Sequence, residues 1–325
     1  MKTLTQSEVK AYVDQAIERA VAKTGSTEAV KPSHREVFHW PPHAISYDYH
    51  VTPQQWTERT TIEVRGELLD VDLAHTEHGV FGRVENLWNE ALADSVDEVL
   101  EALVEGCEPW FNRMDAVTEA LGRTERYHGH FDDFHAGELV SLLYCTDRDV
   151  AHTALVEIEK HASTGVFLEA FLAILNDNRH PYRRSAQWCV LDMLEDVNAF
   201  AKTLEDRERI VHAIKNLMWD AQDDYARTIF KAGVVLGGHI SDGIAADDLL
   251  ELFRAPSKYG RVSAVHAVFH LCEWLPEKKD QVLAALEELN GREENLEIKE
   301  FAQCMAQDIA SGATDHVPEP RFDES

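Results

Sequence analysis

Histidines and carboxylates gather in the stretch YHGHFDDFH, which runs from residue 127 to residue 135. His128, His130 and His135 could supply imidazole nitrogens to zinc or a similar metal, and Asp132 could supply a carboxylate oxygen. The spacing matches no standard metal motif, and the stretch lies between predicted helices. An acidic side chain in such a loop could instead cap the helix that follows. We therefore expect either a divalent-metal site or a polar loop here.

A second group of histidines lies within one predicted helix. His266, His270 and Glu273 stand at positions i, i+4 and i+7, so they share one helix face, and a histidine pair at this spacing can chelate an ion. Ala267 follows the first histidine, so the H-E-x-x-H protease motif is absent. The alternative interpretation is a solvated face that lines a groove.

Motifs for nucleophilic or nucleotide chemistry are absent from the sequence. It contains no G-x-S-x-G, no G-x-x-x-x-G-K-S and no G-x-G-x-x-G. We therefore favour a protein without catalytic residues or cofactor. The alternative is a metal- or cofactor-binding enzyme that uses the histidine clusters.

The charge of the chain restricts its partners. Its 325 residues include 31 basic and 59 acidic side chains, a formal net charge of −28. Nucleic-acid binding needs clustered lysine and arginine, so nucleic acid is not an expected partner, whereas a basic protein is. No apolar run of about 18 residues and no signal-peptide core is present, so we expect no membrane partner. Five scattered cysteines without C-x-x-C suit the cytoplasm.

A recurring pattern in the second half of the chain predicts the elements that position these residues. From Arg183, a small residue follows at plus three (Ala186) and an apolar pair at plus seven and eight (Val190, Leu191). The same frame fits three other arginines, with a weaker copy at Lys299. The four arginine anchors are Arg148, Arg183, Arg227 and Arg261. Their spacing of roughly 35 to 45 residues is that of helix-pair repeats.

This pattern resembles the HEAT-repeat superfamily, especially its short bacterial and bilin-lyase-type forms. The residues that carry the resemblance are Asp147-Arg148, Pro181-Tyr182-Arg183, Asp224-Tyr225-Ala226-Arg227 and Tyr259-Gly260-Arg261. The resemblance covers roughly residues 134–311 and implies stacked helix pairs, in which the arginines bond to groups of the neighbouring repeat. It does not extend to the HEAT-type di-iron hydroxylases, because their repeated His-Glu dipeptides are missing.

The predicted fold is therefore all-α: an α-solenoid of HEAT-like helix pairs with a small N-terminal β-hairpin and a covering loop. The hairpin follows from two runs of period-two alternation, residues 60–64 and 69–73, on either side of Gly66. The predicted parts are an N-terminal helix (1–25), a loop and hairpin rich in aromatics and histidine (26–82), the solenoid (83–311) and a flexible acidic tail (312–325).

The expected function is a non-catalytic scaffold or adaptor that binds a basic protein partner in an acidic groove. In the repeat frame His266 takes the position of Trp188, and His270 takes the position of Asp192. A rigid ring supplies contact area and carboxylates select positive charge. The expected groove residues are Trp188, Asp192, Glu195, His266, His270 and Glu273. The alternatives are a bilin-lyase-like or other enzyme, and an acidic inhibitor or immunity protein.

Overall fold

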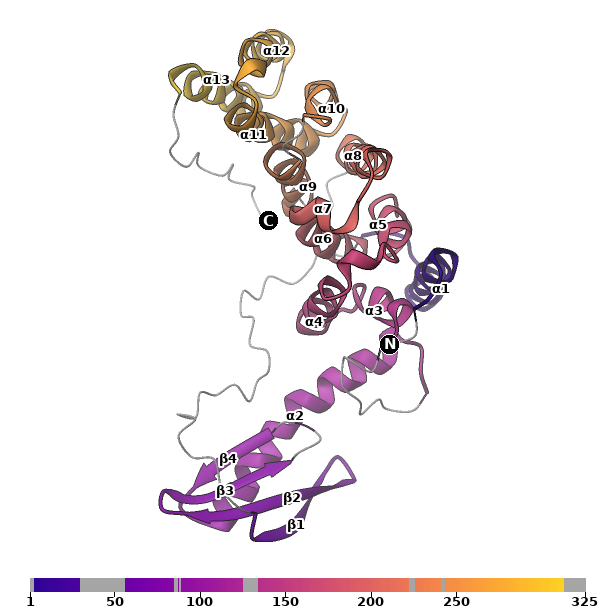
Figure 1. The fold of residues 1–325 in the computed structure, drawn as a ribbon, viewed down its shortest axis with the longest axis vertical. Coiled ribbons are helices and arrows are strands. Elements are labelled where there is room, and N and C mark those ends of the chain that lie inside the picture. Colours follow the sequence, from indigo (N-terminus) through magenta and orange to yellow (C-terminus); the bar gives the residue numbers. More distant parts are fainter. Residues whose placement is uncertain are drawn as a thin grey trace.

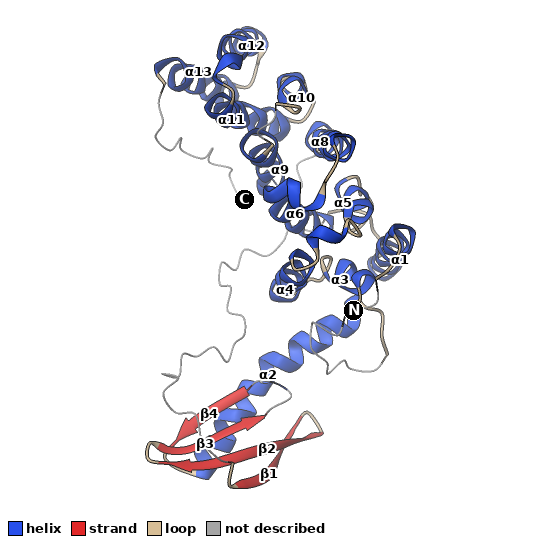
Figure 2. Cartoon of the chain, viewed as in Figure 1, coloured by secondary structure: helices blue, strands red, loops and turns tan. Residues whose placement is uncertain are grey.

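The structure is a computed structural model in which helices dominate and one sheet lies at one end (Figure 1). It describes residues 3–29, 56–84, 87, 89–124, 134–221, 226–240 and 243–312. Figure 2 shows the sheet at the bottom, a long helix that leaves it, and a curved double layer of helices above.

The sheet has four antiparallel strands in the order β1-β2-β3-β4. Its strands are β1 (Glu58–Val64), β2 (Glu67–Thr76), β3 (Gly79–Val84) and β4 (Asn89–Ala93). Val71 and Leu73 of β2 are almost completely buried. The β1–β2 turn places Arg65 at φ 53°, a conformation that non-glycine residues rarely adopt.

The predicted all-α fold class is wrong, because this four-stranded sheet gives the chain mixed helix and strand content. The hairpin is only half of the sheet, which continues through β3 and β4 into the range that the sequence assigned to helices. Gly82 lies in β3 where helix α2 (Val96–Ala120) approaches closely: a Cβ atom there would lie 2.4 Å from Val99 Cγ1. The α-solenoid is likewise not established by the structure.

Helix α2 (Val96–Ala120) connects the sheet to the other helices. Its N-terminus has a capping box, in which Ser95 and Glu98 each satisfy the other's backbone N–H. It contacts β1, β3 and β4, and also helices α3 and α4. The helix runs through Pro109, although proline has no backbone N–H to donate.

Apart from the short α7 (Val197–Phe200), the remaining helices form two layers (Figure 1). The outer layer contains α1 (Gln6–Thr24), α3 (Ala136–Leu142), α5 (Leu168–Leu175), α8 (Leu204–Trp219), α10 (Ala246–Leu252) and α12 (Lys279–Arg292). The inner layer contains α4 (Arg148–Glu159), α6 (Arg183–Met193), α9 (Ala226–Val234), α11 (Lys258–Trp274) and α13 (Leu296–Ser311). In the inner layer each helix contacts the next, from α4 to α13. The inner layer follows the left, concave side of the curve in Figure 1.

The residues of the repeat frame are mostly in the core. Val190 and Leu191 are 0% exposed, and Val268 is 0% exposed. In the first copy Leu155 is buried, but its neighbour Val156 is 38% exposed, contrary to expectation. The repeat frame therefore marks the side of each helix that packs in the core. Its one exposed position named here is Val156, in the first copy.

Most of the predicted covering loop, from Ser26 to Trp56, lies outside the described residues, as does the tail after residue 312. Trp56 is described, and its ring centroid lies 5.6 Å from that of Phe81 in β3. The guanidinium of Arg83 lies 4.3 Å from the centroid of the Trp56 ring. The last residue of this segment therefore packs on the sheet.

Candidate partner-binding site

Helix α6 presents three of the predicted groove residues on one side. Trp188, Asp192 and Glu195 are spaced at i, i+4 and i+7, and the short 3-10 turn Leu194–Asp196 continues the helical path to Glu195. The opposite side of the helix is buried in the core. Trp188 and Asp192 are consequently half-buried and Glu195 is exposed.

Lys231 of α9 joins these three residues. Its Nζ donates a hydrogen bond to Asp192 Oδ1 at 2.7 Å and another to Glu195 Oε1. The same ammonium group lies 5.4 Å from the centroid of the Trp188 ring, within cation–π range. Burial lowers the pKa of Lys231, but the hydrogen bonds to the two carboxylates outweigh it and raise the pKa overall. The predicted acidic groove thus contains a cation of its own.

A third carboxylate, that of Glu159 at the end of α4, interacts electrostatically with the same cluster. Partial burial raises the pKa of Glu159, and the negative charges of Asp192 and Glu195 raise it further. The charge of His152 acts in the opposite direction and lowers the pKa of Glu159. Three carboxylates against one ammonium group leave this cluster net acidic.

The other predicted groove residues form a series of hydrogen bonds on α11. His270 Nδ1 lies 2.9 Å from Glu273 Oε2, and His270 Nε2 lies 3.1 Å from His266 Nε2. Phe230 packs on His266, with ring centroids 4.6 Å apart. His266 is only 5% exposed, so the expectation that both histidines open to solvent is wrong for His266.

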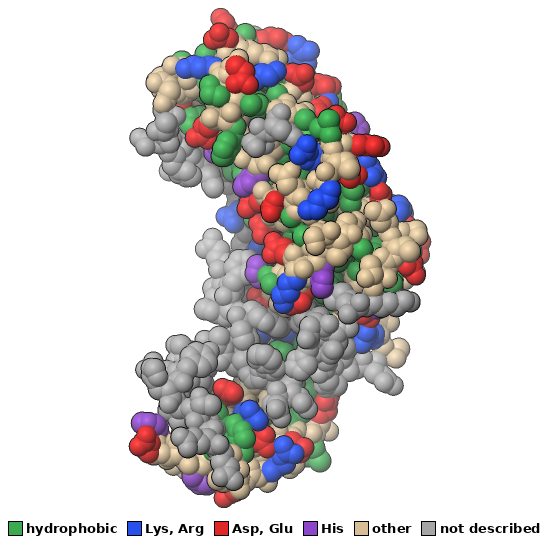
Figure 3. Space-filling model, in the orientation of Figure 1, with side chains coloured by type: hydrophobic (Ala, Val, Ile, Leu, Met, Phe, Trp, Pro, Cys, Tyr) green, Lys and Arg blue, Asp and Glu red, His purple; other side chains and the backbone are tan. Residues whose placement is uncertain are grey.

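Phe230 and Lys231 are adjacent in α9, so α9 links the two predicted sets. We call the two sets together the inner face, which comprises Glu159, Trp188, Asp192, Glu195, Lys231, His270 and Glu273. Figure 3 shows histidine, cationic and acidic side chains together along the hollowed left edge of the helical part. Sequence reasoning missed Lys231, although a single lysine in the apolar run TIFKAGVV of an acidic chain is a signal for a carboxylate partner.

Only one residue of the predicted metal cluster falls in the described part of the chain. His135 is the N-cap of α3, where its Nδ1 accepts a hydrogen bond from the Glu138 N–H at 3.3 Å. His128, His130 and Asp132 lie outside the described residues. Within the described ranges, no group of three or more histidine, cysteine, aspartate or glutamate residues is placed to hold a metal ion.

Two of the arginine anchors, Arg183 and Arg261, donate hydrogen bonds that join neighbouring parts of the fold. Arg261 donates to Glu293 Oε2 at 2.7 Å, between α12 and α13, and to the Ala255 carbonyl at 2.8 Å. Arg183 donates to the carbonyls of Thr27 and His180. Arg148 is half-buried and Arg227 is exposed.

Comparisons with protein-family models, with curated proteins and with solved structures found no match to this chain. The resemblance to HEAT repeats therefore stays a prediction from the sequence. Among the described helices, none is long and apolar enough to cross a membrane.

Proposed function

We propose that this chain is a non-catalytic scaffold whose inner face binds a basic segment of a partner protein. The observation that carries the proposal is the binding of Asp192 and Glu195 to a single ammonium group, that of Lys231, beside the ring of Trp188, with the carboxylate of Glu159 near enough to feel the charges of Asp192 and Glu195. A lysine or arginine side chain of a partner would reduce the excess negative charge. Trp188 would supply a rigid apolar surface of the kind found at the centres of interfaces.

The position of Lys231 decides which acidic groups a partner can use. Its side chain is only 14% exposed, and Asp192 Oδ1 is 2.7 Å away, so this pair is a fixed part of the protein. Glu159 and Glu195 are exposed and can accept hydrogen bonds from a second cation. We propose that Glu159 and Glu195 are the docking carboxylates and that Asp192 holds Lys231 in place.

The proposed partner is consistent with the whole chain, whose net charge of −28 attracts cationic segments over a distance of about one Debye length. We further propose a cytoplasmic location, because all five cysteines are free thiols.

A displayed library of short peptides, selected against the immobilised chain, tests the proposal. The test variant is Glu159→Gln/Glu195→Gln, which keeps the Asp192–Lys231 pair. The control is Asp280→Asn/Glu287→Gln, which removes the same charge from exposed positions of α12. We expect the enriched peptides to be basic and to bind the test variant about tenfold more weakly, a difference of roughly 1.4 kcal/mol.

Their affinity for the wild-type chain should also fall as salt rises, and less steeply for the test variant. Equal affinity for the test variant and the control, or selection of uncharged peptides, would show that the inner face is not an acidic docking site.

A further inference from the structure

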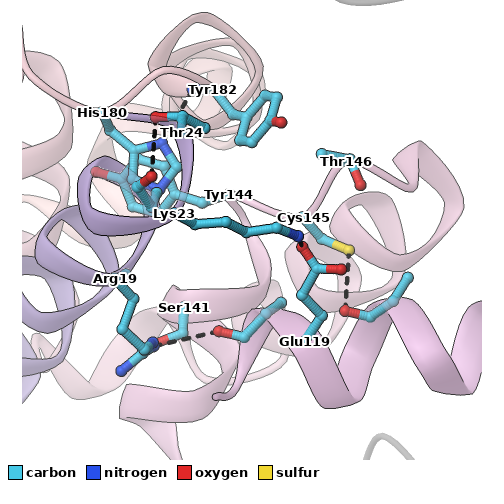
Figure 4. A pocket seen from close by; sticks show the side chains of 14 residues that line it. Arg19, Lys23, Thr24, Glu119, Ser141, Tyr144, Cys145, Thr146, His180 and Tyr182 are labelled. Atoms are coloured by element: carbon cyan, nitrogen blue, oxygen red, sulfur yellow. Dashed lines mark hydrogen bonds and ion pairs between the residues drawn. The ribbon is translucent and has the colours of Figure 1, made fainter. Parts of the chain in front are cut away.

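A small cavity lies between four segments that are distant in the sequence. Its volume is about 80 Å³, and it is enclosed by α1, the end of α2, the residues that follow α3 and the loop before α6 (Figure 4). Small side chains form much of the wall, which includes Ala16 and Ala20 of α1 and Ala116 and Ala120 of α2. The space is thus left by side chains too short to fill the gap between two helices.

The cation in the wall of this cavity lacks a carboxylate partner. Arg19 is half-buried and forms no ion pair with any described residue, although the chain has 59 acidic side chains. Its Nη2 donates to the Ala120 carbonyl at 3.2 Å, which uses one of five N–H donors. Figure 4 shows this guanidinium reaching from α1 toward α2. The other N–H groups of this partly buried guanidinium remain available to an anion.

The mouth of the cavity has a second cation in an exchangeable pair. Lys23 pairs with Glu119, and the two side chains are 64% and 61% exposed. Exposed ion pairs contribute little stability, so an entering anion can replace Glu119 at small cost.

Apart from Glu119, the other polar side chains of the lining are neutral. The Tyr182 N–H donates to His180 Nδ1 at 3.0 Å, which leaves the proton of the neutral ring on Nε2. Burial raises the pKa of Tyr144 well above its ordinary value and that of Cys145 to about 12, so both stay protonated. Glu119 is therefore the acidic residue of the lining, against two cations.

We propose that this cavity binds a small carboxylate, held by Arg19 and Lys23, at a site separate from the inner face. A guanidinium binds carboxylates with two parallel hydrogen bonds. The volume of about 80 Å³ is several times the roughly 10–15 Å³ that one water needs, so the cavity has room for a carboxylate with two or three carbons. The open mouth also admits the carboxylate end of a longer acid.

Calorimetric titration and thermal unfolding with sodium propionate test the site, against sodium chloride at equal ionic strength. We expect saturable binding of one propionate, with the midpoint of unfolding raised by about 2 °C or more at saturation. Arg19→Gln should weaken binding by about tenfold or more. Ala120→Leu, which fills the cavity, should abolish it. Lys10→Gln, which removes one charge from the same helix outside the cavity, should leave it unchanged.

Acetate, hexanoate and phosphate define the ligand class. Tighter binding of hexanoate than of propionate assigns the site to the end of a longer acid, and the reverse assigns it to a free small acid. Tighter binding of phosphate would overturn the assignment to a carboxylate. The proposal fails if the midpoint of unfolding rises without saturation, or rises equally in the wild type and in Arg19→Gln. Either result would show a general salt effect and a cavity that is only a packing defect.

Discussion

The imidazole of His180 stacks on the phenol ring of Tyr144, with ring centroids 4.1 Å apart and an interplanar angle of 28°. Burial, together with the positive charges of Arg183 and Arg19, lowers the pKa of His180 to about 3. The native protein therefore contains a neutral histidine across the whole mildly acidic range.

This histidine should make the protein sensitive to acid. Below about pH 6.5 His180 binds a proton in the unfolded chain but not in the folded chain. The free energy of unfolding therefore falls as the pH decreases from 6.5 toward 3. We expect a loss of about 2 kcal/mol between pH 7 and pH 5 from this group. His180→Gln should flatten the slope of unfolding free energy against pH, whereas His212→Gln, at an exposed position, should not. Equal slopes in both variants would contradict the prediction.

The hydroxyl of Tyr144 should contribute nothing to stability. It is buried without a hydrogen-bond partner among the described residues. Because an unsatisfied buried hydroxyl is costly, Tyr144→Phe should leave the free energy of unfolding unchanged or raise it by up to about 1 kcal/mol. Urea denaturation measures this. Tyr144→Ala is the control for the ring and should lose about 3–5 kcal/mol. A loss above about 1 kcal/mol for the phenylalanine variant would reveal a partner for the hydroxyl.

Two glycines should respond to alanine in opposite directions. At Gly82 a Cβ atom would lie 2.4 Å from Val99 Cγ1 and 3.1 Å from Leu103 Cδ1, so Gly82→Ala should lose about 1–3 kcal/mol of stability. At Gly291, within α12, a Cβ atom meets nothing within 4 Å, and Gly291→Ala should gain about 0.5–1 kcal/mol. Thermal unfolding of both variants gives the comparison, and a stable Gly82→Ala would mean that α2 does not pack on β3 as closely as the structure shows.

Two Arg–Glu ion pairs should differ in how much they contribute to the free energy of unfolding. Arg261 and Glu293 are 18% and 6% exposed, so Arg261→Met leaves a nearly buried carboxylate and should cost about 3–5 kcal/mol. Arg254 and Glu288 are 60% and 58% exposed, and Arg254→Met should give no measurable change. Chemical denaturation of both variants measures the difference. Similar losses would remove the basis for a structural role of Arg261.

Local features of the chain were predictable because neighbours in the sequence produce them. The capping boxes at Thr5/Glu8 and Ser95/Glu98 need residues only three positions apart, and both form. The burial of Val190 and Val268 follows from helical periodicity. The β1–β2 hairpin follows from alternation and a short turn.

Features that depend on distant segments were decided only by the tertiary structure. The glycine pattern of β3 resembles a loop until β2 pairs with it and α2 packs against Gly82. Lys231 neutralises Asp192 from 39 positions away, and this changes a predicted acidic groove into a partly compensated one. The cavity at Arg19 exists because α1 packs against helices more than a hundred residues further along the chain. Sequence spacing determines which residues share one face of a helix. Only the packing of the whole chain determines which faces of different helices and strands contact each other.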